Sequence, residues 1–249
     1  MLKVLINGCN GKMGQVLATQ IRETQDVEVI CGVDRIDTGD NSFPVFTDTH
    51  SIDIIPDVII DFSVPAATFP ILEFAKKNNI PIVIATTGFS DKEQQKINEY
   101  SNSLPIFQSS NMSYEINLMA KLVASLAQKL PSSDIEIIET HHNRKVDAPS
   151  GTALILANSI NEACDNSFYY EYDRHSKREK RSKNEIGIHS LRGGTEAGKH
   201  TVIFFGNNES LEITHNVTSR SVFADGAIKA AEFIIHKDNG MYSMNDLCK

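Results

Sequence analysis

Basic and imidazole side chains gather in one short polar stretch near the middle of the sequence. This stretch follows an apolar run that predicts a strand over 134–140, and it contains His141, His142, Arg144 and Lys145. Imidazole and ammonium groups transfer protons near neutral pH. Ser150 can then cap a helix whose first N–H groups, on Gly151 and Thr152, would be free to bind an anion. We expect proton transfer beside one bound carboxylate, or two.

Two other interpretations apply to the same stretch. One is a basic surface loop that precedes an ordinary helix cap. The other is a zinc site, but adjacent residues on an extended strand point to opposite faces, so His141 and His142 would not easily share one ion. The sequence also lacks an HExxH pattern. We therefore expect no metal.

A glycine-rich loop follows the first apolar run of the chain. Gly8, Gly11 and Gly14 have the spacing GxxGxxG between a predicted strand and a predicted helix. Glycines at such a turn let the backbone approach a pyrophosphate, and the helix N-terminus holds its charge. A plain strand–turn–helix loop is the alternative. The residues that we expect to bind a dinucleotide here are Gly8, Cys9, Asn10, Gly11, Lys12 and Met13.

Asp34 and Arg35 stand at the end of the second predicted strand, twenty residues past Gly14. A carboxylate there accepts a hydrogen bond from the free 2′-hydroxyl of the adenine ribose in NADH, whereas an arginine pairs with the 2′-phosphate of NADPH. Because both are present, we expect either cofactor to be used. Two further strand ends leave room for a flat nicotinamide ring, although each alone could be a simple loop. They are Ala85, Thr86 and Thr87, and Ser109, Ser110, Asn111 and Met112.

The elements that must position these residues change character along the chain. Short strands that are apolar almost throughout alternate with helical patterns in the first half, which predicts a doubly wound parallel sheet. The strands are expected at 2–6, 27–33, 58–62, 82–86 and 106–108, and the helices at 13–21, 68–77 (with Pro70 in its first turn) and 90–101, the last opened by a capping box.

The second half predicts an α+β arrangement. A long amphipathic helix after Ser113 has one apolar stripe, formed by Leu118, Met119, Leu122, Val123 and Leu126. Three alternating runs within 184–216 predict an open, largely antiparallel sheet with one face on helices. The basic run 173–183 is expected to be a solvated loop. The apolar helix 227–235 is expected to return to the first domain.

Composition excludes several classes of protein. The net charge of −8 disfavours a nucleic-acid or anionic-membrane binder. No apolar run is long enough to span a membrane, the first residues do not resemble a signal peptide, and four scattered cysteines suggest neither zinc nor disulfides. We expect a cytoplasmic protein without nucleic-acid or membrane partners.

At this point the sequence resembles the 4-hydroxy-tetrahydrodipicolinate reductase family from about Val4 to Phe233. The motifs that carry the resemblance are the glycine loop, Ala85-Thr86-Thr87-Gly88-Phe89, His141-His142-x-x-Lys145-x-Asp147-Ala-Pro-Ser-Gly-Thr152-Ala153, Arg192-Gly193-Gly194, Gly198-x-His200 and His215-x-x-x-x-Arg220. The histidine motif is highly specific, whereas the glycine loop is not.

The resemblance implies a Rossmann-type domain, 1–112 with 222–249, and a smaller α+β domain with an open mixed sheet, 113–221, that binds substrate and forms a homotetramer. It also implies reduction of a small dicarboxylate by NADH or NADPH, on the diaminopimelate route to lysine. His141 would act as the proton donor or acceptor and Lys145 as a further proton donor, and His142, Gly151 and Thr152 would hold the carboxylates. We expect the two domains to close for hydride transfer.

The sequence leaves two alternatives. One is a different two-domain NAD(P) dehydrogenase, which need not keep the histidine motif. The other is a nucleotide-sensing regulator with a DNA-binding module, but the sequence shows no recognition helix with a basic face. Oxidation of NADH or NADPH with the reductase substrate would separate all three.

Overall fold

A computed structural model describes residues 1–248. Contacts divide the chain into two compact units, which we call unit 1 (1–114 with 220–249) and unit 2 (115–219). Each unit has its own sheet and its own hydrophobic core. Within the described residues, no helix is both long and apolar enough to cross a membrane.

Unit 1 is built on a seven-stranded sheet in the order β12-β6-β5-β4-β1-β2-β3, with every neighbouring pair parallel. The strands are β1 (Leu2–Asn7), β2 (Val27–Val33), β3 (Val45–Phe46), β4 (Val58–Asp61), β5 (Ile82–Ile84), β6 (Pro105–Gln108) and β12 (Gly240–Tyr242). The order reverses between β1 and β4, and loops at the carboxyl ends of strands meet at such a switch point. The Rossmann-type parallel sheet is therefore confirmed, with β3 and β12 as additional edge strands.

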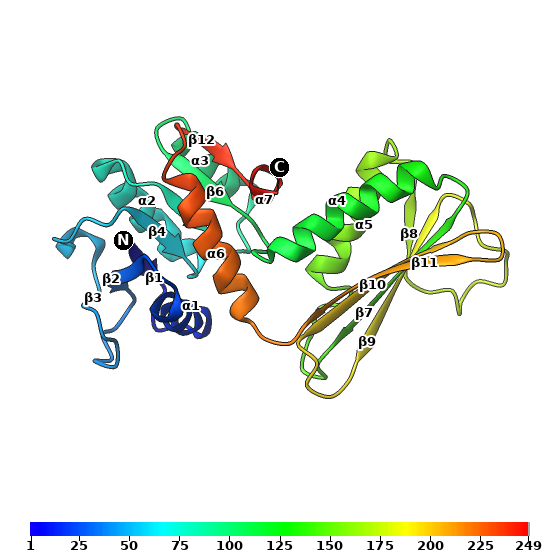
Figure 1. The fold of residues 1–249 in the computed structure, drawn as a ribbon, viewed down its shortest axis with the longest axis horizontal. Helices are drawn as coiled ribbons and strands as arrows, with labels where there is room; N and C mark the ends of the chain where they lie inside the picture. The colour runs from blue at the N-terminus through cyan, green and yellow to red at the C-terminus, as the bar shows by residue number, and fades with distance from the viewer. Residues whose placement is uncertain (249) are drawn as a thin grey trace. The chain divides into compact units, whose positions relative to one another are not determined.

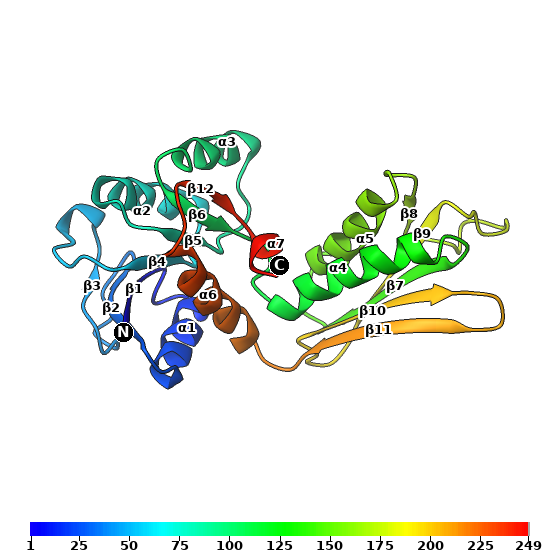
Figure 2. The ribbon, with the colours of Figure 1, turned by 45° about the horizontal axis from the view of Figure 1, so that its top comes forward.

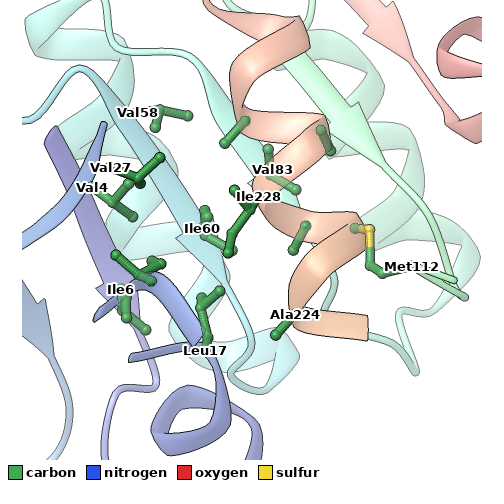
Figure 3. Close-up of a cluster of buried hydrophobic side chains, with 14 of the residues drawn as sticks. Val4, Ile6, Leu17, Val27, Val58, Ile60, Val83, Met112, Ala224 and Ile228 are labelled. Atoms are coloured by element: carbon green, nitrogen blue, oxygen red, sulfur yellow. The ribbon is translucent and has the colours of Figure 1, made fainter. Parts of the chain in front are cut away.

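Helices cover both faces of this sheet (Figure 1). The helices α1 (Lys12–Glu23) and α6 (Ser221–Ile234) pack on one face, and α2 (Pro65–Asn78) and α3 (Asp91–Tyr100) pack on the other. Figure 3 shows Leu17 of α1 and Ile228 of α6 beside Ile60 of β4. The C-terminal segment, which ends in α7 (Met244–Leu247), therefore completes the N-terminal unit.

Local signals in unit 1 mark one helix start correctly and misplace another. Ser90 and Glu93 form the expected capping box at the start of α3. The helix α2 begins at Pro65, three residues before the expected start, so Pro70 lies inside the helix and not in its first turn. Pro65 occupies the first helical position, where its missing N–H costs no hydrogen bond. A short 3-10 helix, η1 (Thr49–Ser51), was not predicted.

Unit 2 holds a five-stranded sheet in the order β11-β10-β7-β9-β8. The strands are β7 (Asp134–His141), β8 (Tyr169–Glu171), β9 (Glu185–Arg192), β10 (Gly198–Phe205) and β11 (Ser210–Val217). The pairs that include β10 are antiparallel, but β7–β9 and β8–β9 are parallel. The largely antiparallel sheet expected from the alternating runs is therefore wrong, and the mixed sheet that the resemblance implies is confirmed. The chain crosses over between β7 and β9, and a crossover gives a parallel pair.

Two helices, α4 (Tyr114–Lys129) and α5 (Gly151–Ala163), lie side by side over one face of the unit 2 sheet (Figure 2). The buried stripe of α4 consists of Ile116, Met119, Ala120, Val123 and Ala127. Leu118 and Leu122, which the sequence predicts in this stripe, are instead 48% and 49% exposed. Met119 and Val123 are buried as expected, and the small side chains of Ala120 and Ala127 lie in the stripe with them, which favours close packing on the neighbouring elements.

The basic segment 173–183 is more than a solvated loop. Most of its residues are exposed. However, the Arg181 guanidinium contacts the carboxylates of Asp134 and Glu136 and donates to the backbone carbonyls of Ile135 and Glu185. One arginine therefore ties the loop to β7 and β9.

Candidate functional site

The glycine loop of unit 1 follows β1 and requires glycine at two positions. Gly8 has a φ of +82°, and a Cβ there would lie 2.7 Å from the carbonyl oxygen of Phe62. A Cβ at Gly14 would lie 2.2 Å from the carbonyl oxygen of Gly8. Gly11 is the N-cap of α1 and gives that helix no side-chain cap. The loop therefore has the open backbone and uncapped helix start that suit a pyrophosphate.

Asp34 follows β2 and is bonded to the same loop. Its Oδ2 accepts a hydrogen bond from the backbone N–H of Asn10 at 2.8 Å, and its Oδ1 accepts one from the N–H of Arg35 at 2.8 Å. The Asn10 side chain donates to the carbonyl oxygen of Ile36 at 2.7 Å. The structure thus brings together the glycine loop and the residues expected to contact a ribose, and Arg35 itself is exposed.

The other two predicted segments follow neighbouring strands of the same sheet. Ala85, Thr86 and Thr87 come after β5, and Ser109 to Met112 come after β6. The N–H of Ser109 donates to the carbonyl oxygen of Ile84 at 3.2 Å. The side chains of Cys9 and Met112 lie in the core, so only their backbone is available to a ligand. The remaining members lie at the carboxyl edge of the sheet.

A buried polar network, which the sequence alone did not predict, lies beneath these loops at the carboxyl ends of the strands. The Asp61 carboxylate at the end of β4 accepts hydrogen bonds from Asn7 at 2.9 Å, Ser63 at 2.5 Å and Thr68 at 2.6 Å. The N–H of Ser63 donates to the hydroxyl of Thr86 at 2.9 Å. Burial raises the pKa of Asp61, and the hydrogen bonds oppose this effect. The network joins the ends of β1, β4 and β5.

In unit 2, the polar stretch is organised around Glu139, which is fully buried on β7. Its carboxylate lies 2.5 Å from Nδ1 of His141. Arg192 of β9 donates to both carboxylate oxygens, at 2.7 and 2.8 Å. Burial alone would raise the pKa of Glu139, but hydrogen bonds from Arg192, Ser190 and His141 outweigh it and lower the pKa to about 2. The carboxylate is therefore ionised at neutral pH.

The start of α5 belongs to the same cluster. The Ser150 hydroxyl caps the helix as expected, accepting a hydrogen bond from the N–H of Ala153 at 3.2 Å. The N–H of Ser150 donates to Glu139 at 3.1 Å, and its hydroxyl lies 2.8 Å from Nε2 of His200. Gly151 and Thr152, the expected anion-binding residues, are the first two residues of this helix. The predicted proton-transfer and anion-binding groups are thus joined by hydrogen bonds.

His142 and Lys145 complete the stretch. The N–H of His142 donates to the carbonyl oxygen of Glu196 at 2.8 Å, and its Nδ1 is buried with no hydrogen-bond partner within residues 1–248. Nζ of Lys145 lies 2.8 Å from Asp147, whose backbone carbonyl oxygen accepts from Arg192 at 2.7 Å. Contacts therefore run without a break from Lys145 through Arg192 to Glu139 and His141.

Family models cover almost the whole chain. The model described as "Dihydrodipicolinate reductase, N-terminus" matches residues 2–112, and "Dihydrodipicolinate reductase, C-terminus" matches residues 115–248. The chain belongs to the dihydrodipicolinate reductase family. Two curated relatives are both named 4-hydroxy-tetrahydrodipicolinate reductase. The protein from Caldanaerobacter subterraneus subsp. tengcongensis is 48% identical over 100% of this chain and 99% of the relative, and the protein from Clostridium novyi is 43% identical over the same shares.

A solved structure agrees with this membership in the reductase family. The dipicolinate-bound dihydrodipicolinate reductase from Paenisporosarcina sp. TG-14 superposes with a TM-score of 0.83 at 28% identity, over 98% of this chain and 99% of that one. The two-domain organisation, a Rossmann-type sheet with a second mixed sheet, is therefore that of the family. Within residues 1–248, no group of three or more histidine, cysteine, aspartate or glutamate side chains is placed to hold a metal ion.

The sequence alone predicts no role for Glu139, Arg192 or His200, although Arg192 and His200 belong to the family motifs and Glu139 lies in the predicted strand 134–140. Part of this was accessible, because residues two apart on a strand share a face and Glu139 stands two positions before His141. Arg192 stands 53 residues further on and reaches Glu139 only through the parallel pairing of β7 with β9. Nothing in the local sequence predicts that β7 and β9 pair in parallel.

Proposed function

We propose that this chain reduces 4-hydroxy-2,3,4,5-tetrahydrodipicolinate with NADH or NADPH, on the diaminopimelate route to lysine. Tetrahydrodipicolinate, the oxidised cofactor and water are the products. Membership in the reductase family and the names of the curated relatives support this activity. The observation that carries it is the hydrogen-bond cluster of unit 2, which joins His141 to the start of α5.

The bound nicotinamide supplies a hydride in this reaction. Unit 1 would hold the dinucleotide: the backbone of the glycine loop would bind the pyrophosphate, Asp34 and Arg35 the adenine ribose, and the loops after β5 and β6 the nicotinamide. The φ of Gly8, the uncapped start of α1 and the position of Asp34 support these assignments.

Unit 2 holds the substrate, a small dicarboxylate. The N–H groups at the start of α5, on Gly151 and Thr152, bind one carboxylate of the substrate. The side chain of His142 also binds a substrate carboxylate. His141 gives up a proton as negative charge develops on the reduced substrate, and Lys145 is a second proton donor. The dipicolinate bound to the Paenisporosarcina relative is itself a dicarboxylate, which supports this substrate class.

A direct assay tests the activity. The substrate is made in situ by a synthase from pyruvate and aspartate semialdehyde, and oxidation of the cofactor is followed at 340 nm. We expect turnover with NADH and with NADPH. If neither NADH nor NADPH were oxidised, the proposed function would be overturned.

We further propose that the chain acts as a cytoplasmic homotetramer with no nucleic-acid or membrane partner. Unit 2 leaves one face of its sheet without a helix, and this open face presents apolar side chains that include Leu191 and Phe205, 48% and 44% exposed. The net charge of −8 also disfavours polyanionic partners. Light scattering coupled to size-exclusion chromatography tests the assembly, and a monomer mass would contradict it.

A further inference from the structure

Glu139 receives hydrogen bonds from two parts of the candidate site at once. Its Oε2 faces Nδ1 of His141 at 2.5 Å, and its Oε1 accepts from the N–H of Ser150 at 3.1 Å. The two Arg192 nitrogens hold the same two oxygens at 2.8 and 2.7 Å. The motif residue Arg192, which has no part in the proposed function, therefore fixes the orientation of this carboxylate. A bidentate arginine–carboxylate pair is rigid as well as strong.

The first contact decides which nitrogen of His141 carries a hydrogen. An ionised carboxylate only accepts hydrogen bonds, so Nδ1 of His141 must donate to Glu139. The proton that His141 gives up then leaves from Nε2, on the opposite side of the ring. A Cβ at Gly198 would lie 3.0 Å from Nε2, so glycine at this motif position leaves space beside that atom.

The second contact sets the start of α5. Ser150 is the N-cap of this helix, and its backbone N–H is held by Glu139 while its hydroxyl faces His200. The helix N-terminus, where a substrate carboxylate is proposed to bind, is therefore fixed relative to His141 by one shared side chain. A displacement of about 1 Å between a proton donor and its substrate can cost two orders of magnitude in rate.

Other charged or titratable groups face this pair from each neighbouring element. Arg192 comes from β9, His200 from β10, His215 from β11, and Lys145 from the loop after β7. The rings of His200 and His141 pack edge to face, with their centroids 5.1 Å apart. Burial and the charge of His141 lower the pKa of His200 to about 4, so His200 stays neutral at neutral pH. Two further carboxylates act on these groups from outside, Asp147 on Lys145 and Glu115 on His215, whereas Glu139 is the carboxylate that contacts His141 itself.

We propose that Glu139 is a positioning residue that holds the proton donor His141 in one tautomer and fixes the substrate-binding start of α5, with Arg192 clamping its carboxylate. This role rests on the proposed function, because the positioned groups are those that would protonate and bind the dicarboxylate. Glu139 is fully buried and acts through these groups.

The test replaces the carboxylate without changing the size of the side chain. Glu139→Gln should lower kcat about 100-fold or more and leave the Kd for NADH unchanged, since that ligand binds to unit 1. The pH profile of kcat should change as well, because the ring of His141 loses its adjacent negative charge. Glu139→Asp keeps the charge and should recover most of kcat.

A matched control lies on the opposite face of the same strand. Glu136 also meets an arginine and a histidine, Arg181 at 3.0 Å and His189 at 2.7 Å. Glu136→Gln therefore breaks a similar trio outside the candidate site. It should keep kcat and its pH profile within about twofold of the wild type.

A measurement without substrate separates this proposal from the proposed function. Long-range ¹H–¹⁵N spectra of the histidine rings, assigned with His141→Gln, should show neutral His141 carrying its hydrogen on Nδ1 in the wild type and in Glu139→Asp, and losing this preference in Glu139→Gln. A wild-type enzyme that turns over, together with a Glu139→Gln variant of normal kcat and pH profile, would overturn the positioning role alone. An inactive wild type would overturn the proposed function, and the spectra would still decide the tautomer: no change in Glu139→Gln would overturn the positioning role as well.

Discussion

The side chain of His141 concentrates the chemistry of unit 2 in one ring. We expect His141→Gln to lower kcat at least 100-fold, because the proton that accompanies the hydride loses its donor. The Kd for NADH should not change, since every residue expected to bind the dinucleotide lies in unit 1. Steady-state rates and isothermal titration calorimetry measure the two effects. A kcat near that of the wild type would remove His141 from the mechanism.

Arg35 offers a second test at the scale of one residue. Its exposed guanidinium can pair with a 2′-phosphate, whereas Asp34 is already bonded to the backbone of Asn10 and Arg35. We expect Arg35→Ala to raise the KM for NADPH about tenfold and to leave the KM for NADH within twofold, since an exposed ion pair contributes about 1 kcal/mol or somewhat more to a charged ligand. Lys12→Ala, beside the pyrophosphate loop, is the comparison and should weaken both cofactors alike.

Residue-level prediction succeeded where the relevant neighbours are close in sequence. The cap at Ser150 depends on a residue three positions away, and the sequence predicts it. The pair of Glu139 with Arg192 depends on strand register, which places His141 opposite Arg192 across a parallel pair. Register between distant strands is decided by the whole core, so the motifs containing Arg192 and His200 could be seen but not connected.

At the scale of the elements, β7, β10 and β11 place one polar row across the inner face of the unit 2 sheet. The register sets Glu139 opposite His200 and His200 opposite His215. Burial and the nearby His141 lower the pKa of His200 from 6.5 to about 4. The unfolded chain therefore binds a proton between these two values that the folded chain does not, and stability must fall as the pH falls through that window.

When the pH is lowered from 7.5 to 5, His200 alone should accordingly lower the free energy of unfolding by about 2 kcal/mol. Urea unfolding followed by circular dichroism at the two pH values measures the difference. His200→Gln should remove most of this component, and comparing each variant with itself cancels any loss of packing. The comparison is His50→Gln, whose exposed ring pairs with Asp48 at 3.0 Å; because an exposed ion pair contributes little to stability, this variant should keep most of the wild-type pH dependence. An unchanged dependence in His200→Gln would contradict the assignment.

The helix α6 packs closely on the backbone of Met112, and this contact gives a second prediction at the scale of the elements. A Cβ at Gly226 would lie 1.7 Å from the carbonyl oxygen of Met112, and backbone cannot give way as a side chain can. Alanine normally favours a helix over glycine by about 1 kcal/mol, but here we expect Gly226→Ala to destabilise by about 2 kcal/mol. Gly151→Ala has nothing within 4 Å of its Cβ and should not lower the unfolding midpoint.

Element-level prediction failed where two arrangements satisfy the same pattern. The helix α4 has a leucine stripe and a stripe with Ala120 and Ala127, and both follow helical spacing. Hydrophobicity favours the leucines, but the helix buries the stripe that allows close approach, and this choice depends on the neighbours α5 and the sheet. The parallel pairing of β7 with β9 was missed for a similar reason, since alternation within a strand does not reveal its direction.

At the scale of the whole molecule, the open face of the unit 2 sheet carries the proposed assembly. The proposal is that another chain covers the exposed Phe205, which lies on a strand face that no helix of its own unit covers. Phe205→Asp would place a charge in that interface, and burying an unpaired charge is costly. We expect this variant to dissociate into smaller species.

Light scattering after size exclusion should therefore give a mass of about four chains for the wild type and a lower mass for Phe205→Asp. Leu122→Asp is the matched control, because Leu122 is also about half exposed but lies on α4, away from the sheet face. This control should keep the wild-type mass. Equal masses for the wild type and Phe205→Asp would show that this end of the open face is not an interface. If Leu122→Asp alone dissociated, the contact between chains would instead involve the outer side of α4.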